Sequence, residues 1–358
     1  MNIHELTTTN ILTPLREPLL AWYRASGRDL PWRRTTDPYP IWISEIMLQQ
    51  TRVAAVLGYY ARFLAAFPTV EALAAAPEEQ LMKLWEGLGY YSRARNLQRA
   101  AKTIAAAGRF PDTYEGLLSL PGIGEYTAGA IASAAFGLRE AAVDRNVLRV
   151  VMRLADCHED ITDPRVKAAV RTAVQQAMPE EKADIRIFNQ AMMELGATVC
   201  GPNGEPKCGC CPGHDLCLAR AHGTALSLPV KKAKKERRVE EKTVYVLLQG
   251  GKVALRRRPD TGLLASLWEF PNVEGKLDED HAAAAVESWG LTPKGWHKRL
   301  SARHIFTHVE WHMTGYVLEA EGKGFLWVDA EGLKGHAVPS AFGKFYDEAL
   351  RALEKEGE

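Results

Sequence analysis

The hydrophobic pattern of the chain changes character about two thirds of the way along it. Before about residue 225, apolar residues recur at the three- and four-residue spacing that places them on one face of a helix. Two short segments, Glu79–Trp85 and Arg99–Ala107, have this character. It is clearest between residues 143 and 154, at Val143, Val147, Val150, Val151 and Leu154. The first part of the chain is therefore predicted to be all-α.

After about residue 242 the apolar runs are shorter and glycine turns divide them. Val244–Leu248 and Val253–Leu255 flank Gly250-Gly251, which is typical of a β-hairpin. Further strands are expected at Gly315–Leu318 and Phe325–Val328, and helices at Asp280–Trp289 and Phe345–Leu353. This part is predicted to be a mixed α/β domain.

The segment between these regions is basic. Lys231–Arg238 has six basic residues in eight and no apolar periodicity. We therefore expect domains at 1–225 and 242–358, joined by a solvated basic linker at 226–241. A linker of this charge would also be able to contact phosphates.

Composition limits the class of protein. The 358 residues suffice for two cores, and 46% hydrophobic with 25% charged residues is ordinary for globular proteins. The formal net charge of +1 does not itself indicate a nucleic-acid binder, so any DNA contact must be local. No apolar run is long enough to cross a bilayer, and Met1–Asn10 lacks a signal-peptide core. We expect a cytoplasmic protein without membrane contact.

One turn stands out among the helical segments. Leu120–Ala128 contains Pro-Gly-x-Gly, which is typical of a tight turn between two helices. Amides near Gly122 and Gly124 would lie at a helix N-terminus, where phosphates bind. Asp144 follows eighteen residues after Tyr126, within reach of the attached sugar. Taken alone, the turn also suits an ordinary helix pair with a solvated aspartate.

Five cysteines lie close together, at Cys200, Cys208, Cys210, Cys211 and Cys217. In a cytosolic chain such crowding indicates metal rather than disulfides. Thiolate ligands suit an iron–sulfur cluster or a four-cysteine zinc site, and the spacing does not decide between them. Cys157 stands apart and is expected in a core.

Longer motifs resemble a known family. Leu30–Arg33, Trp42–Thr51, Gly87–Asn96 and Phe188–Ala197, together with the turn and Asp144, look like MutY-type adenine DNA glycosylases over nearly the whole chain. The resemblance implies a helix-hairpin-helix glycosylase domain with an iron–sulfur loop, followed by a Nudix-like domain. It also implies a monofunctional enzyme of base excision repair that removes adenine opposite 8-oxoguanine or guanine in double-stranded DNA.

The same resemblance assigns a [4Fe-4S] cluster to the cysteine loop at 200–217. Its ligands would be Cys200, Cys208, Cys211 and Cys217, with Cys210 outside the set. The first gap is one residue longer than the family's C-x6-C-x2-C-x5-C spacing.

Glu45 is the candidate general acid. It lies among Trp42, Ile46, Met47 and Leu48, and partial desolvation there would raise its pKa. By resemblance Glu45 protonates adenine N7, and Asp144 stabilises or transiently bonds the sugar C1′. The alternative for Glu45 is an exposed helix residue in a surface ion pair.

By the same resemblance, Tyr126 and Asn146 hold these two groups. Tyr126 replaces the lysine of the family's lyases, and a phenol cannot form a Schiff base.

Other residues are assigned to the DNA by resemblance. Gln50 and Tyr90 would lie near the opposite base, although Tyr90 also suits a core. The adenine pocket would be lined by Arg33 and Gln190. Phe306, Thr307 and His308 stand where the family has Phe-Ser-His and would meet the Hoogsteen edge of 8-oxoguanine.

Gly262–Pro271 resembles a Nudix segment, but the helix that follows has one glutamate at 282–290 instead of several. Recognition is therefore expected from this domain, and metal-dependent hydrolysis is the disfavoured alternative.

Two positions depart from the family pattern. Arg145 replaces a glycine, and Glu125 places an acid on the phosphate-binding turn. They leave open a nonenzymatic lesion sensor, beside a pyrimidine-directed glycosylase of the same superfamily. A monomer is expected, and replication and mismatch-repair proteins are candidate partners.

Overall fold

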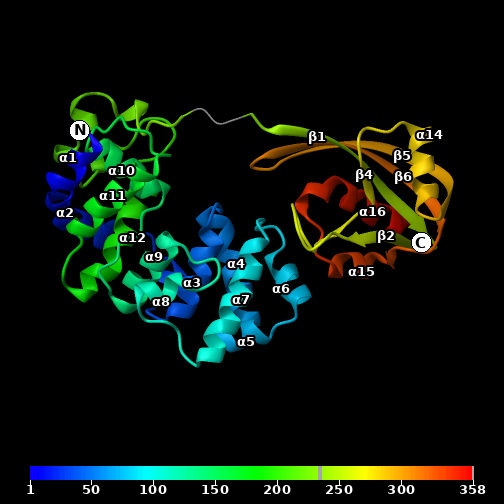
Figure 1. The fold of residues 1–358 in the computed structure, drawn as a ribbon, viewed down its shortest axis with the longest axis horizontal. Helices are drawn as coiled ribbons and strands as arrows, with labels where there is room; N and C mark the ends of the chain where they lie inside the picture. The colour runs from blue at the N-terminus through cyan, green and yellow to red at the C-terminus, as the bar shows by residue number, and fades with distance from the viewer. Residues whose placement is uncertain (233–235, 357–358) are drawn as a thin grey trace. The chain divides into compact units, whose positions relative to one another are not determined.

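The computed structural model describes residues 1–232 and 236–356, which divide into two compact units (Figure 1). Within these residues, the first unit comprises 1–75 and 95–232, and the second comprises 76–94 and 236–356. The second unit therefore includes a stretch that the sequence places in the helical region. Residues 233–235 of the expected basic linker lie outside the described residues.

The chain is helical as far as residue 221, as its apolar spacing predicts. The helices are α1 (Ile3–Thr8), α2 (Arg16–Ser26), α3 (Pro38–Leu48), α4 (Val53–Ala66), α5 (Val70–Ala75), α6 (Glu78–Trp85), α7 (Ser92–Ala107), α8 (Tyr114–Leu118), α9 (Glu125–Phe136), α10 (Arg145–Leu154), α11 (Pro164–Ala177), α12 (Lys182–Thr198) and α13 (Leu218–Ala221). No helix in the described ranges has both the length and the apolar character needed to span a membrane.

Helix α10 is the centre of the first unit. All its residues from Val147 to Leu154 are buried, in a core that they share with α2, α11 and α12. The helix begins later than the apolar pattern predicts, because Asp144 is its N-cap and accepts a hydrogen bond from the Val147 amide. A carboxylate is thereby fixed at the end of a buried helix.

The second unit contains a mixed sheet of order β3-β2-β1-β6-β5, in which β4 also pairs with β1 and β7 with β2. Only the β1–β6 pair is parallel among these described pairs. The strands are β1 (Arg238–Gln249), β2 (Lys252–Arg257), β3 (Trp268–Glu269), β4 (Asn272–Glu274), β5 (Leu291–Ile305), β6 (Val309–Gly322) and β7 (Leu326–Val328).

The predicted hairpin is present, with Leu248 opposite Val253. Strand β1 starts at Arg238, however, because it pairs with β6 from that residue onward. The last residues of the expected linker at 226–241 are therefore strand.

Helices cover both faces of the sheet. One face packs on α15 (Ala330–Gly335) and α16 (Gly343–Glu356), and the other packs on α14 (Glu279–Ser288). Successive residues of a strand point to opposite faces, so β1 gives Val244, Val246 and Leu248 to one core and Tyr245 and Leu247 to the other. The turn between β5 and β6 carries Phe306, Thr307 and His308, and Phe306 packs against the core on the α15 and α16 face.

Candidate active site

A cavity of about 580 Å³ lies in the first unit, between α3, α9, α10 and α12. Six of the residues assigned from the sequence line it: Arg33, Glu45, Tyr126, Asp144, Asn146 and Gln190. They come from segments more than 150 residues apart in sequence, so the fold brings together what the motifs indicate separately.

Glu45 is buried, at 9% relative exposure, because α3 is apolar around its whole circumference. The interpretation of Glu45 as an exposed surface residue is therefore wrong. Burial raises the pKa of Glu45 to about 7, and the charge of Asp144 adds to this, whereas Tyr126 and Arg33 oppose it. Glu45 thus exchanges a proton near neutral pH.

Tyr126, in the first turn of α9, is the hydrogen-bond partner of Glu45. Its hydroxyl donates to Glu45 Oε2 at 2.7 Å and lies 3.2 Å from Met193 Sδ. Burial and the nearby carboxyls raise the pKa of Tyr126 well above its ordinary value. The phenol therefore stays protonated and acts as a donor.

Asp144 is held by two donors. Oδ1 accepts from the Val147 amide and Oδ2 accepts from Asn146 Nδ2, both at 2.8 Å. Burial raises the pKa of Asp144, and these hydrogen bonds act against the shift. The two carboxyls of the cavity therefore have different environments. Glu45 accepts one hydrogen bond, whereas Asp144 accepts two at the N-terminus of a helix.

Asn146 is in turn fixed by Arg149, which is itself buried. Arg149 Nη2 donates to Asn146 Oδ1 at 2.9 Å and to the Gly196 carbonyl at 2.7 Å. Arg149 Nε donates to the Cys200 carbonyl at 2.8 Å. A continuous set of hydrogen bonds thus joins Asp144 to the first cysteine of the loop.

Arg28 and Glu194 are among the cavity residues that were not predicted. Glu194 is almost fully buried and receives Arg28 Nε at 2.6 Å and Arg33 Nη2 at 2.8 Å. Burial alone would raise the pKa of Glu194, but the two arginines lower it below the usual range. The sequence signal was a lone acid in the apolar helix 188–197, with a second arginine just before Leu30–Arg33.

The Pro-Gly-x-Gly turn joins α8 to α9 as expected. Gly122 has φ 79°, and a Cβ there would lie 2.6 Å from Asn96 Cβ, so both conformation and space require glycine. Gly124 is the N-cap of α9 in an extended conformation, and no side chain caps the helix there. Glu125 is exposed, with Arg171 Nη1 at 3.4 Å.

Two further residues lie away from the cavity lining. Gln50 is exposed just after α3, with φ 61°, a strained value for a residue other than glycine. Arg145 is exposed in the first turn of α10.

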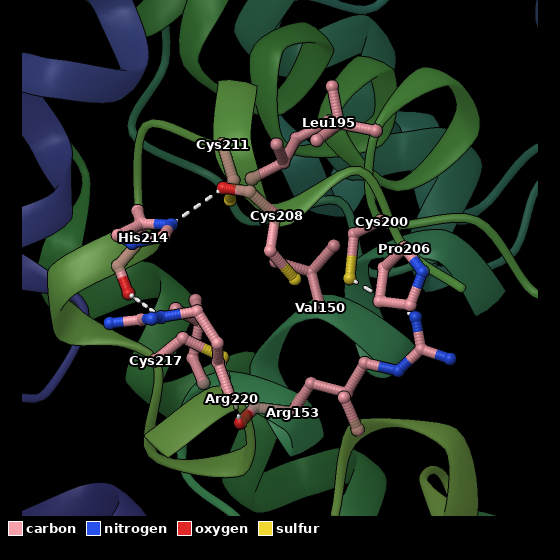
Figure 2. Close-up of a pocket in the computed structure, with 13 residues that line it drawn as sticks. Val150, Arg153, Leu195, Cys200, Pro206, Cys208, Cys211, His214, Cys217 and Arg220 are labelled. Atoms are coloured by element: carbon pink, nitrogen blue, oxygen red, sulfur yellow. Dashed lines mark hydrogen bonds between the residues drawn. The ribbon is translucent and has the colours of Figure 1, made fainter. Parts of the chain in front are cut away.

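The cysteine loop forms a second cavity in the first unit (Figure 2). It is lined by Cys200, Cys208, Cys211 and Cys217, beside Arg153 and His214. Cys210 is exposed and is not part of this lining, and its thiol lies 3.4 Å from the Lys207 carbonyl. Among the described residues, no three His, Cys, Asp or Glu side chains are close enough to one point to hold a single metal ion.

The four cysteines nevertheless suit a larger cationic group. Burial raises the pKa of the Cys211 thiol to about 11 and also raises that of Cys217, so their thiolates need a compensating positive charge. Arg153 Nη1 supplies one such contact, at 3.4 Å from Cys200 Sγ.

In the second unit, Tyr90 meets the turn between β5 and β6. Tyr90 is 47% exposed, with φ 48°, and its hydroxyl lies 2.7 Å from Thr307 Oγ1. Tyr91 is the buried member of the pair. Phe306 packs edge-on against Trp311, with ring centroids 4.8 Å apart, and His308 is exposed.

Comparisons with known proteins agree with this arrangement. Residues 43–176 match the family described as HhH-GPD superfamily base excision DNA repair protein, and residues 243–348 match the NUDIX domain family.

Individual relatives extend the similarity to nearly the whole chain. An adenine DNA glycosylase of Homo sapiens is 35% identical over 94% of this chain and 74% of its own length. One of Buchnera aphidicola subsp. Baizongia pistaciae is 33% identical over 84% of each chain. The structure of a thermostable thymine-DNA glycosylase aligns with a TM-score of 0.52 and 29% identity, over 60% of this chain and 99% of its own. On the identity and coverage of these relatives, the chain belongs to the adenine DNA glycosylase family.

Proposed function

We propose that this adenine DNA glycosylase of base excision repair is monofunctional and hydrolyses the N-glycosidic bond of adenine opposite 8-oxoguanine or guanine in duplex DNA. The observation that carries the proposal is the pair of carboxyls, Glu45 and Asp144, in one cavity with different hydrogen-bond partners. Glycoside hydrolysis uses such a pair, one as proton donor and one to stabilise the sugar cation.

Glu45 is the general acid of this mechanism. With a pKa of about 7 it carries a proton at neutral pH and donates it to adenine N7. The bond between C1′ and the base then breaks, and its electron pair leaves with the protonated adenine.

Asp144 stabilises the positive charge that develops at C1′, and Val147 and Asn146 fix its orientation. Water adds to C1′ and passes a proton to the Glu45 carboxylate, which restores the acid and completes hydrolysis. Tyr126 offers no amine, so strand cleavage through a Schiff base does not follow.

The positions of the remaining residues suggest how each of them contacts the DNA. The uncapped amides that follow Gly124 bind a phosphate at the start of α9, next to the turn at Gly122. Arg33 and Gln190 line the pocket for the extruded adenine. Gln50, Tyr90 and the residues Phe306, Thr307 and His308 contact the opposite base. In this scheme residues 1–225 supply catalysis and 242–358 recognise the lesion, and the linker expected at 226–241 ends where strand β1 begins, at Arg238.

Cys200, Cys208, Cys211 and Cys217 would hold a [4Fe-4S] cluster. Hydrolysis transfers no electrons, so the chemistry that the cluster supplies is structural. When bound, it would fix the loop at 200–217. Arg149 Nε donates to the carbonyl of Cys200, the first residue of this loop.

The test is single-turnover excision on duplexes carrying adenine opposite 8-oxoguanine, guanine, cytosine or thymine, each with and without alkali. We expect cleavage that requires alkali and is fastest opposite 8-oxoguanine. Nicking without alkali would indicate a lyase. Tight binding without product would indicate a lesion sensor, a role that the exposed position of Arg145 outside the cavity lining disfavours.

A further inference from the structure

Tyr23 on α2 lies outside the cavity lining but contacts two residues within it. Its hydroxyl donates to Gln190 Oε1 at 2.8 Å. The guanidinium carbon of Arg33 lies 5.4 Å from the centre of its ring. One tyrosine therefore supports two side chains of the proposed adenine pocket.

The surroundings of Tyr23 fix its position. A Cβ at Gly27 would lie 2.9 Å from a carbon of the Tyr23 ring, so glycine leaves the space that the ring needs. Burial raises the pKa of Tyr23, and Glu194 adds to the shift, although Arg33 and Arg28 oppose it. The hydroxyl thus keeps its proton and remains available as a donor.

A glutamine amide has one end that accepts hydrogen bonds and one that donates them. Because Gln190 Oε1 is engaged by Tyr23, the donating Nε2 end is available to a base in the cavity. Adenine has only acceptors at its ring nitrogens N1, N3 and N7, whereas guanine has a donor at N1. A fixed donor that meets N1 therefore favours adenine over guanine.

We infer that Tyr23 is a positioning residue for base selection, which holds the Gln190 amide with its donors toward the extruded base. This inference rests on the proposed function. It concerns how Gln190 is oriented, which neither the sequence motifs nor the family assignment specifies.

A double-mutant cycle of Tyr23→Phe and Gln190→Leu tests the coupling. Excision of adenine opposite 8-oxoguanine is measured under single turnover, with melting temperature as the folding control. We expect Tyr23→Phe to slow excision about fivefold, as for the removal of one neutral hydrogen bond, and to have no further effect beside Gln190→Leu. Tyr59→Phe is the matched control, because Tyr59 also has an arginine over its ring, Arg62 at 4.8 Å, but does not line the cavity.

Base analogues identify the contact that Tyr23 supports. The ratio of wild-type to Tyr23→Phe rates is measured for adenine, 1-deazaadenine and 3-deazaadenine, so that the intrinsic reactivity of each base cancels. We expect the ratio to fall to one for the analogue that lacks the acceptor facing Gln190. A structural role for Tyr23 would leave the ratio equal for all three bases.

Three results would overturn the inference: an unchanged rate in Tyr23→Phe, an equal loss with and without Gln190, or an equal ratio for all three bases. The same cycle is also measured as affinity for a duplex whose adenosine carries fluorine at C2′, which disfavours the sugar cation and blocks excision. Absence of excision by the wild type would refute the proposed function, while the binding cycle would still decide the role of Tyr23.

Discussion

At the scale of single residues, the central feature is a carboxyl in an apolar helix. Glu45 is surrounded by buried side chains of α3 and receives one hydrogen bond, from Tyr126. The neutral form of such a group is favoured by desolvation and the charged form by its donor. Desolvation by burial is the larger of the two effects, and the pKa of Glu45 is raised.

This balance makes stability depend on pH. The pKa of Glu45 rises from 4.5 to about 7 on folding, so the folded protein holds more protons between these values, and stability falls as pH rises through them. The Glu45→Gln variant has no carboxyl to titrate at this position, so it does not lose stability in this way as pH rises. We expect the variant to gain up to about 3 kcal/mol over wild type between pH 5 and pH 8. Thermal unfolding at both pH values measures this, and a difference independent of pH would contradict it.

The same residues carry the chemistry. Glu45→Gln and Asp144→Asn should each slow excision by at least about a hundredfold, because each removes a group used in the transition state. Duplex binding should persist, since neither side chain is a phosphate ligand. Gel-shift affinity and single-turnover rates separate the two effects. Near wild-type excision in either variant would refute the role of that residue.

At the scale of elements, the contact between α10 and α12 positions the site. Gly196 on α12 lets Asn146 approach, and a Cβ there would lie 2.6 Å from Asn146 Cβ and 3.0 Å from the Asn146 carbonyl oxygen. The position of the start of α10, and of Asp144, therefore depends on glycine at position 196.

Gly196→Ala should separate the two helices. We expect a loss of about 1–3 kcal/mol in stability, as for overpacking, and slower excision because Asp144 moves with Asn146. Gly201→Ala is the matched control, since a Cβ at Gly201 meets nothing within 4 Å. Denaturant unfolding and single-turnover rates measure both effects, and equal behaviour of the two variants would show that the contact is not critical.

The cysteine loop makes a second prediction at this scale. Cys210→Ser should keep the visible absorption and iron content of the cluster, because Cys210 is exposed and outside the cavity lining. Cys208→Ser should reduce both. Loss of the cluster in Cys210→Ser would instead place Cys210 among the ligands.

Many of the helices and strands could be predicted from the sequence. Periodic apolar positions predicted α6, α14, α16 and the β1–β2 hairpin, because burial of one face dictates the spacing. The long strand β5 was not predicted, since most of its residues are exposed or half-buried and their polarity shows no clear alternation.

The site itself was only partly predictable. Motifs indicated Glu45 and Asp144, but the Arg28–Glu194 ion pair depends on contacts between residues 166 apart, which spacing cannot specify.

At the scale of the whole molecule, a chain with a net charge of +1 must bind DNA, which is strongly negative. Three exposed basic residues precede strand β1: Lys231, Lys232 and Arg237. Their positive charge is local, because the net charge of the whole chain is only +1. We propose that this segment contacts phosphates.

Neutralising these three residues to glutamine should weaken duplex binding without changing the excision rate of bound duplex. The slope of log affinity against log salt should fall by about 0.9 for each phosphate that the segment no longer neutralises, or up to about 2.7 in total. Binding titrations across salt concentrations measure the slope. A full slope in the triple variant would show that the segment is only a linker.

The pKa of Glu45 also has a consequence for a population of molecules. With a pKa of about 7, Glu45 is protonated in more copies as pH falls through neutrality and in fewer copies as pH rises. The fraction of molecules that are ready to protonate adenine is then set by the ambient pH, even when the amount of protein is constant. A mild acid shift would raise that fraction without any new synthesis.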